Sequence, residues 1–282
     1  MTVTTYVEAV ASARADDREL VQVEQEGSGA IVRMNDPERL NPLSAPLTLQ
    51  LREALSGLAS DAGVRAIVLT GADPAFSAGG DLRLMRDVAH PMVDDGPDGA
   101  TAPWEWIRNE FGGVAKLIAR TDKAFIAAIN GAAAGVGLSF ALACDMIVCS
   151  ERAQLVPAFG RIGLVPEVGQ SWLLTRRLGY QRTFELFATG RHLSGREAYE
   201  LGIANAVVAH EELMGAAAAW CGKLDGLPAH VLKMMKPLLR NAADLSWEQA
   251  IAMEEFAEPM CFTTEAHRAA VGELLSRDSD PG

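Results

Sequence analysis

Short apolar runs and glycine-rich turns alternate along this chain and constrain its fold more than any other feature. The runs are RAIVL at residues 65–69, AFIAAI at residues 124–129 and DMIV at residues 145–148, with helical stretches between them. Strands that alternate with helices predict an α/β fold in which most strands pair in parallel. Ligands of such folds bind where a strand ends and a helix begins. We therefore expect the functional site at three glycine-rich turns: ADPAFSAGGDL, NGAAAGVGLSF and RIGLVPEVGQS.

The surrounding stretches carry local signals of their own. Two β-rich segments flank the glycine-containing turn at residues 27–29 and predict a hairpin. Leucines at helical spacing predict a helix over Ala45–Ala59 with Ser44 as its N-cap. From about residue 165 the pattern indicates helices apart from a short strand at Ala206–Ala209, and SGRE at residues 194–197 predicts a capped helix start.

Residues 87–103, DVAHPMVDDGPDGATAP, combine prolines, glycines and four aspartates. This composition predicts a mobile surface loop, and a lid over a pocket is the functional alternative. Trp104 and Trp106 follow directly and are two residues apart, so on a helix at most one of them would line a pocket. His90, inside the segment, is expected to be solvated.

Charge and length exclude several classes of function. The chain has 282 residues, with 25 basic and 37 acidic side chains and a formal net charge of −12. A field of this sign repels nucleic acid and anionic membranes, so neither is an expected partner. No apolar run approaches the ~18 residues of a membrane span and no signal-peptide core is present, which favours a cytoplasmic protein. The four cysteines show no metal-ligand spacing, so no metal is expected.

The turns Ala75–Leu82 and Asn130–Phe140 follow predicted strands and lead into predicted helices. Backbone N–H groups at such helix starts can hold an oxyanion, and glycines at residues 79 and 80 would let a ligand approach closely. Neither turn contains GxxxxGK[ST], and no GxGxxG follows a strand. Nucleotide binding therefore has no support in the sequence.

The order of the motifs AFSAGGDL, KAFIAAINGAAAGVGLSFALACDMIV and GRIGLVPEVGQSWLLTRRLG resembles the crotonase (enoyl-CoA hydratase/isomerase) superfamily. The resemblance covers about residues 20–225 and implies a ClpP/crotonase-like α/β fold of repeated ββα units with a helical C-terminal region. On this basis we expect an N-terminal extension over residues 1–18, an acyl-CoA-binding core over 19–210 and a helical trimerisation region over 211–282. The implied assembly is a homotrimer or a hexamer.

The same resemblance implies a site for an acyl-CoA thioester without a cofactor, since coenzyme A is part of the substrate. The N–H groups of Gly80 and Val136 would hold the thioester oxygen, and the valine stands where many relatives have glycine. Contacts to acyl-CoA are implied for Arg39, Leu40, Asn41, Ala78, Gly79, Asp81 and Leu82. Among these, Arg39 is the candidate for a CoA phosphate, and a solvated loop arginine is the alternative.

Two positions that hold glutamates in efficient hydratase relatives map onto Ser139 and Phe159. A serine can hydrogen-bond a water but is a poor general base near neutral pH, and phenylalanine transfers no protons. Hydration by the usual pair of acids is therefore not expected.

One carboxylate lies in the expected neighbourhood, that of Glu167 in GLVPEVG. Pro166 fits the first helical position, so Glu167 is predicted in a first helical turn, where a surface glutamate would also be stable. Family members with an acid here include isomerases that convert 3-enoyl-CoA to 2-enoyl-CoA, in which the acid moves a proton between carbons. We therefore expect double-bond isomerisation of an enoyl-CoA thioester, with oxyanion donors stabilising the dienolate and an apolar pocket raising the carboxyl pKa.

Other reactions stay open at this point. The position of Glu167 holds a nucleophilic aspartate in dehalogenase relatives, so an acid there does not fix the reaction. A weak hydratase that uses Ser139, or another crotonase reaction, is the main alternative. An acyl-CoA binder with a degenerate site is the third.

Overall fold

The computed structural model of this chain describes residue 3 and residues 5–278. The chain forms two compact units, Met1–Gly222 and Lys223–Gly282. The candidate site belongs to the first unit.

A six-stranded sheet forms the centre of the first unit, with the strand order β1-β2-β4-β7-β9-β12. Its strands are β1 (Val21–Glu26), β2 (Gly29–Met34), β4 (Ala66–Gly71), β7 (Ala124–Ile129), β9 (Met146–Ser150) and β12 (Ala206–Val208). The pair β1–β2 is antiparallel, which confirms the predicted hairpin, and the other neighbouring pairs are parallel. Every residue of β4 and β7 is buried. This agrees with their continuous apolar runs, which are typical of parallel strands covered on both faces of the sheet.

A second, four-stranded sheet has the order β11-β10-β8-β5, and a two-stranded ladder joins β3 and β6. These strands are β3 (Pro42–Leu43), β5 (Ala75–Ser77), β6 (Gly79–Gly80), β8 (Ala132–Ala134), β10 (Gln154–Val156) and β11 (Leu193–Ser194). After a short turn β4 leads into β5, β7 into β8 and β9 into β10, so the chain passes repeatedly from the large sheet to the small one. The ββα repeat is confirmed, whereas β11 lies in a stretch where only helices and the strand at residues 206–209 were predicted.

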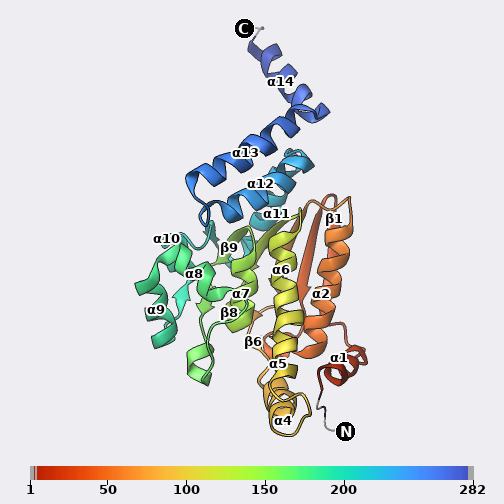
Figure 1. Cartoon of the computed structure of the whole chain (residues 1–282), viewed down its shortest axis with the longest axis vertical. Coiled ribbons are helices and arrows are strands. Elements are labelled where there is room, and N and C mark those ends of the chain that lie inside the picture. Colours follow the sequence, from red (N-terminus) through yellow and green to blue (C-terminus); the bar gives the residue numbers. More distant parts are fainter. Residues whose placement is uncertain (1–2, 4, 279–282) are drawn as a thin grey trace. The chain divides into compact units, whose positions relative to one another are not determined.

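Helices cover the sheets of the first unit, and α2 packs against α6 beside the large sheet (Figure 1). The helices are α1 (Tyr6–Arg14), α2 (Ala45–Ser60), α3 (Leu82–Leu84), α4 (His90–Asp94), α5 (Thr101–Trp106), α6 (Gly112–Arg120), α7 (Gly135–Ala143), α8 (Gln170–Leu178), α9 (Tyr180–Thr189) and α10 (Gly195–Glu200). The Ser44 hydroxyl accepts a hydrogen bond from the Leu47 N–H, which confirms it as N-cap. Ser194 and Glu197 form the predicted capping box of α10.

Residues 87–103, predicted as a loop, instead contain two short helices. A π-helical turn (Met85–Ala89) leads into α4, and α5 continues into a second π-helical turn (Ile107–Phe111). Met92 and Trp106 are 3% and 7% exposed and belong to the hydrophobic core. The loop prediction was wrong because aspartates and glycines dominate the local composition, while burial of a few apolar side chains decides the structure.

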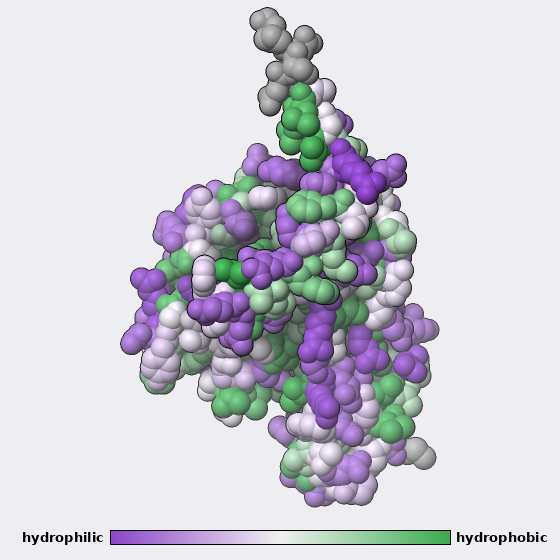
Figure 2. Space-filling model, turned by 45° about the horizontal axis from the view of Figure 1, so that its top comes forward, coloured by the Kyte–Doolittle hydropathy of each residue, from purple (hydrophilic) through white to green (hydrophobic). Residues whose placement is uncertain are grey.

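The second unit contains the predicted C-terminal helices α12 (Ala229–Ala242), α13 (Trp247–Phe262) and α14 (Glu265–Asp278), and α11 (Leu213–Asp225) spans the boundary between the units. Large apolar side chains such as Trp247 and Phe256 are exposed on α13. Figure 2 shows hydrophilic and hydrophobic residues interspersed over the face that it presents. Within the described residues, no helix is both long enough and apolar enough to cross a membrane.

Candidate active site

Two glycine turns meet just beyond the ends of the neighbouring strands β5 and β8. Gly79 and Gly80 form β6, while Gly135 and Val136 begin α7, which is buried along its whole length. A Cβ atom on Gly79 would lie 2.7 Å from the Ala134 carbonyl oxygen, so the two backbones approach as closely as glycine allows. Gly79 and Gly135 also have φ values of +87° and +48°, which glycine adopts without strain. The structure therefore brings the two predicted oxyanion turns together.

A cavity of about 500 Å³ opens beside these turns. Its walls include Gly80, Leu82, Met85, Trp106, Val165 and Glu167. The lining is apolar apart from Asp81, His90, Glu167 and Tyr6. Trp106 lines the cavity and the exposed Trp104 does not, which confirms that at most one of the two would do so. His90 is exposed, as predicted, and borders the cavity.

Among the described residues, Glu167 and Asp81 are the two acidic residues that line this cavity. It lies in an irregular segment between a 3₁₀ turn (Phe159–Ile162) and α8, so its prediction in a first helical turn was wrong. Within residues 5–278, no hydrogen bond or ion pair reaches its carboxylate. Burial in apolar surroundings raises the pKa of Glu167 to about 7. A carboxyl group with this pKa exchanges a proton readily near neutral pH.

The backbone next to Glu167 has an unusual conformation. Val168 has a φ of +56°, in the left-handed region that β-branched residues rarely adopt. Gly169 follows with a φ of +80° and precedes the first residue of α8. The two left-handed residues change the direction of the chain, so no helix begins at Pro166 and α8 begins at Gln170. This explains why Glu167 faces the cavity and does not lie on the helix.

A buried chain of hydrogen bonds holds this segment against α7. The Gln170 side-chain amide donates to the Ser139 hydroxyl (3.2 Å) and to the Gly135 carbonyl (2.9 Å), and the Ser139 hydroxyl reaches the Glu167 carbonyl (3.2 Å). Gln170 and Ser139 are both 0% exposed. The backbone of Glu167 is thereby tied to the first turn of α7, which carries Val136.

Sequence reasoning did not identify Gln170. Its burial could have been inferred from the spacing of the helix. Gln170 lies three and four residues before Leu173 and Leu174, so it shares their buried face of α8. Ser139, predicted as a residue that could hold a water, is absent from the cavity lining, and its hydroxyl points to backbone. The Phe159 ring lies within 3.9 Å of the place a Cβ on Gly135 would take, so this position next to the glycine turn is apolar.

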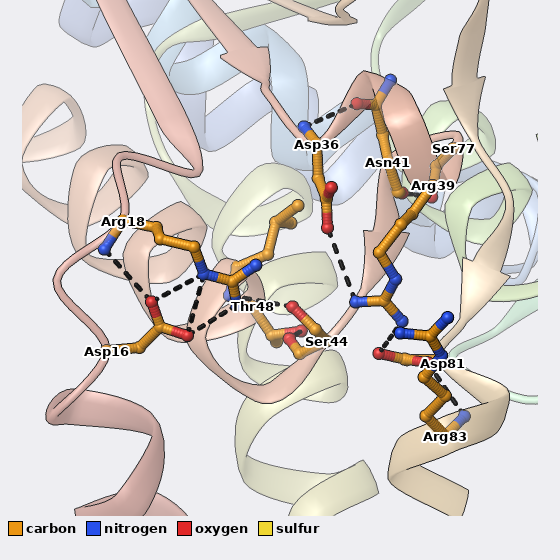
Figure 3. Close-up of polar contacts among 11 residues, drawn as sticks. Asp16, Arg18, Asp36, Arg39, Asn41, Ser44, Thr48, Ser77, Asp81 and Arg83 are labelled. Atoms are coloured by element: carbon orange, nitrogen blue, oxygen red, sulfur yellow. Dashed lines mark hydrogen bonds and ion pairs between the residues drawn. The ribbon is translucent and has the colours of Figure 1, made fainter.

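Arg39, predicted to contact a CoA phosphate, lies between two carboxylates (Figure 3). Its guanidinium is 2.7 Å from the nearest oxygen of Asp81 and 3.6 Å from that of Asp36. The Asp81 side chain also accepts a hydrogen bond from the Arg83 N–H, which caps the short helix α3. Arg39 is thus fixed next to the cavity residue Asp81 and does not itself line the cavity.

The rest of the predicted CoA-binding loop is held by Asn41. Its side-chain oxygen accepts from the Asp36 N–H, and its amide donates to the carbonyls of Ala72 and Ala75. The Leu40 carbonyl accepts from the Ala78 N–H. Asn41 is 0% exposed, whereas Leu82, at the rim of the cavity, is 61% exposed. The loop therefore presents Leu40, Ala78 and Leu82 to solvent and uses Asn41 as its internal anchor.

Comparisons of the sequence and of the structure with known proteins agree on one family. A model of the enoyl-CoA hydratase/isomerase family matches residues 24–272. The chain is 34% identical to 4-chlorobenzoyl coenzyme A dehalogenase-2 of an Arthrobacter species, over 83% of this chain and 82% of that protein. It is 30% identical to 1,2-epoxyphenylacetyl-CoA isomerase of Escherichia coli K12, over 87% and 91%. The crystal structure of an enoyl-CoA hydratase subunit I from Geobacillus kaustophilus superposes with a TM-score of 0.83 at 30% identity, covering 93% of this chain and 97% of the other.

Proposed function

This chain belongs to the enoyl-CoA hydratase/isomerase family and has the crotonase fold, and we propose that it isomerises the double bond of an enoyl-CoA thioester. The observation that carries the proposal is the carboxylate of Glu167. It is unpaired among the described residues, it shares an apolar cavity with Gly80, and burial raises its pKa to about 7.

In the proposed reaction Glu167 removes a proton from carbon 2 of a 3-enoyl thioester. The electron pair of that C–H bond moves into the conjugated system, and negative charge develops on the thioester oxygen. The N–H groups of Gly80 and Val136 would donate to this oxygen and stabilise the dienolate. Glu167 then returns the same proton to carbon 4, which leaves the double bond between carbons 2 and 3. One carboxyl group is sufficient, because it accepts a proton from carbon 2 and donates the same proton to carbon 4.

A carboxyl pKa of about 7 favours proton transfer over the alternatives. Such a group is close to half ionised at neutral pH, so it can act as base and acid in one cycle. A nucleophilic carboxylate needs the opposite, a low pKa that keeps it ionised. Hydration would need a second acid, and the positions of Ser139 and Phe159 provide none.

A dehalogenase-type displacement is the second candidate, because a 4-chlorobenzoyl coenzyme A dehalogenase is 34% identical to this chain. In that reaction the Glu167 carboxylate would attack the ring carbon and chloride would leave. Chloride release from 4-chlorobenzoyl-CoA would identify this reaction directly, and an ion-selective electrode measures it.

The remaining parts of the proposal concern binding and assembly. The CoA portion would contact Arg39, Leu40 and the segment 78–82, and no cofactor beyond the CoA of the substrate is proposed. A homotrimer or a hexamer would cover exposed apolar side chains such as Trp247 and Phe256. The protein would act in the cytoplasm.

The test is conversion of a 3-enoyl-CoA to the conjugated 2-enoyl isomer, followed by absorbance. Glu167→Gln keeps the shape of the side chain and removes its basic oxygen, so we expect kcat to fall by about 10²–10⁴. Glu151→Gln is the matched control, since Glu151 is exposed and lies in a turn away from the cavity. Unchanged turnover in Glu167→Gln would refute the proposed role of this residue.

A further inference from the structure

Helix α1 lies outside the family match, which begins at residue 24, yet it forms part of the cavity wall. Tyr6 and Ala9 line the same cavity as Gly80 and Glu167. In the view of Figure 1, α1 and the segment that leads into α8 lie on opposite sides of α5. The residues that precede β1 therefore form one wall of the cavity.

Local contacts hold α1 in place. Thr5 and Glu8 form a capping box at its start, and Ala9 and Ala13 are 5% and 6% exposed. The helix packs against α2 and α5. Its opposite face carries Val7, which is 73% exposed and takes no part in this packing.

Tyr6 is the residue that fixes this wall. Its hydroxyl donates to a carboxylate oxygen of Glu110 at 2.6 Å, and the other oxygen of Glu110 lies 3.1 Å from the Arg52 guanidinium. Glu110 is 1% exposed, so its carboxylate lies inside the protein, whereas the Arg52 side chain is 32% exposed. A charge-assisted hydrogen bond in a buried setting is stronger than a neutral one and fixes the ring position.

Aromatic rings continue from Tyr6 along the cavity. The Tyr6 ring meets the Trp106 ring edge to face, with centroids 6.4 Å apart, and Trp106 meets Phe111 in the same way at 6.3 Å. All three residues line the cavity. Edge-to-face rings form a rigid apolar surface, because each ring restricts the tilt of the next.

The size of the cavity sets the size of the acyl group. A water molecule takes up about 30 Å³ in the liquid, and a methylene group is of similar size. A volume of about 500 Å³ therefore holds on the order of sixteen non-hydrogen atoms, some of them belonging to the thioester. Among the described residues, no lysine or arginine lines the cavity that could pair with a charged acyl end.

We propose that α1 is the end wall of the acyl site and that Tyr6 limits it to uncharged, apolar acyl groups of about a dozen carbon atoms. This inference rests on the proposed function in one respect only, that the cavity holds the acyl group of a CoA thioester. It does not depend on which reaction Glu167 performs.

The test is calorimetric binding of saturated straight-chain thioesters, namely butanoyl-, octanoyl-, dodecanoyl- and hexadecanoyl-CoA, none of which has a double bond to move. In the unmodified protein, affinity should increase up to dodecanoyl-CoA and then decrease about tenfold for hexadecanoyl-CoA. Tyr6→Ala removes the ring from the wall and should raise the affinity for hexadecanoyl-CoA by about tenfold. Val7→Ala, on the exposed face of the same helix, is the control and should keep the unmodified profile.

Ala9→Leu tests the wall in the opposite direction and does not depend on the Tyr6 variant folding. The larger side chain would fill part of the cavity, so the optimum should move to octanoyl-CoA. The same length profile in the unmodified protein and in both wall variants would overturn the inference. Failure to bind any of the thioesters would overturn the proposed function together with it. Binding with the expected profile, but without isomerisation of a 3-enoyl-CoA, would overturn the reaction alone and support the wall.

Discussion

Replacing Glu167 with glutamine is expected to stabilise the protein at neutral and alkaline pH. Burial raises the pKa of Glu167 from 4.5 to about 7. In the unfolded chain the carboxyl group ionises with its ordinary pKa, so between these values the folded state binds more protons than the unfolded state. Stability is therefore lost as the pH rises through this window, because ionisation in the cavity is unfavourable. Glutamine has nearly the same shape and no charge to bury.

The size of this effect follows from the two pKa values of Glu167, 4.5 and about 7. One pKa unit corresponds to about 1.4 kcal/mol, so the ionised group lowers the free energy of unfolding by about 3 kcal/mol above neutral pH. The side chain is only partly buried, and water screens some of this penalty, which reduces the expected figure to about 2 kcal/mol. The stability advantage of Glu167→Gln should accordingly grow by about 2 kcal/mol between pH ~5 and pH ~8.

Urea denaturation followed by circular dichroism measures this difference at the two pH values. Protein concentration must be held fixed, because subunit association would also shift the transition. Glu151→Gln serves as control, since Glu151 is exposed and its replacement should give the same small change at both pH values. An advantage of Glu167→Gln that is equal at both pH values, or smaller at the higher one, would refute the assignment of a raised pKa.

Three further predictions concern the same region. Isomerisation by the unmodified protein should increase as the pH rises through about 7 and then level off, because the ionised form of Glu167 removes the proton; a pH profile of kcat/KM that is flat between pH ~5 and pH ~9 would contradict this. Gln170→Leu should lower kcat at least about tenfold with little change in KM, since it removes the donor that holds Ser139 against the Glu167 backbone; Ser139→Ala should have a similar effect, and strictly additive effects in the double variant would argue against a shared chain of hydrogen bonds. Asn41→Ala should lower the free energy of unfolding by about 3 kcal/mol in urea denaturation, because three hydrogen bonds of this side chain, buried or partly buried, are lost at about 1 kcal/mol each.

Much of the fold could be predicted from the sequence because its signals are local. The continuous apolar runs of β4 and β7 are what a parallel sheet buried on both faces requires. Ser44 caps α2 through a hydroxyl that reaches only three residues along the chain. The glycine turns were identifiable from their residue type, although the close approach that requires Gly79 comes from residue 134, far along the chain.

The conformation around Glu167 could not be predicted in this way. Proline followed by an acid is typical of a helix start, and local rules placed Glu167 there. The chain instead reverses at Val168, which is left-handed, and the Glu167 carbonyl next to it accepts a hydrogen bond from Ser139, a residue far away in the sequence. The helices within residues 87–103 were not predicted either, because they too depend on tertiary contacts. They are held by the burial of Met92 and Trp106, which local composition does not reveal.

Several unfavourable features are concentrated in the few residues around Glu167. Among the described residues, its partly buried carboxyl group has no partner and the buried Gln170 side-chain oxygen accepts no hydrogen bond, and Val168 is left-handed. Glu167→Gln would relieve the first of these, and Val168→Gly the second at the cost of a side chain that packs against the core. A binder with a degenerate site has no use for such features, whereas a proton shuttle needs a carboxyl group that is isolated, rigidly placed and near half ionisation. Their coincidence beside the Gly80 and Val136 turns therefore favours a catalytic site over a simple binding site.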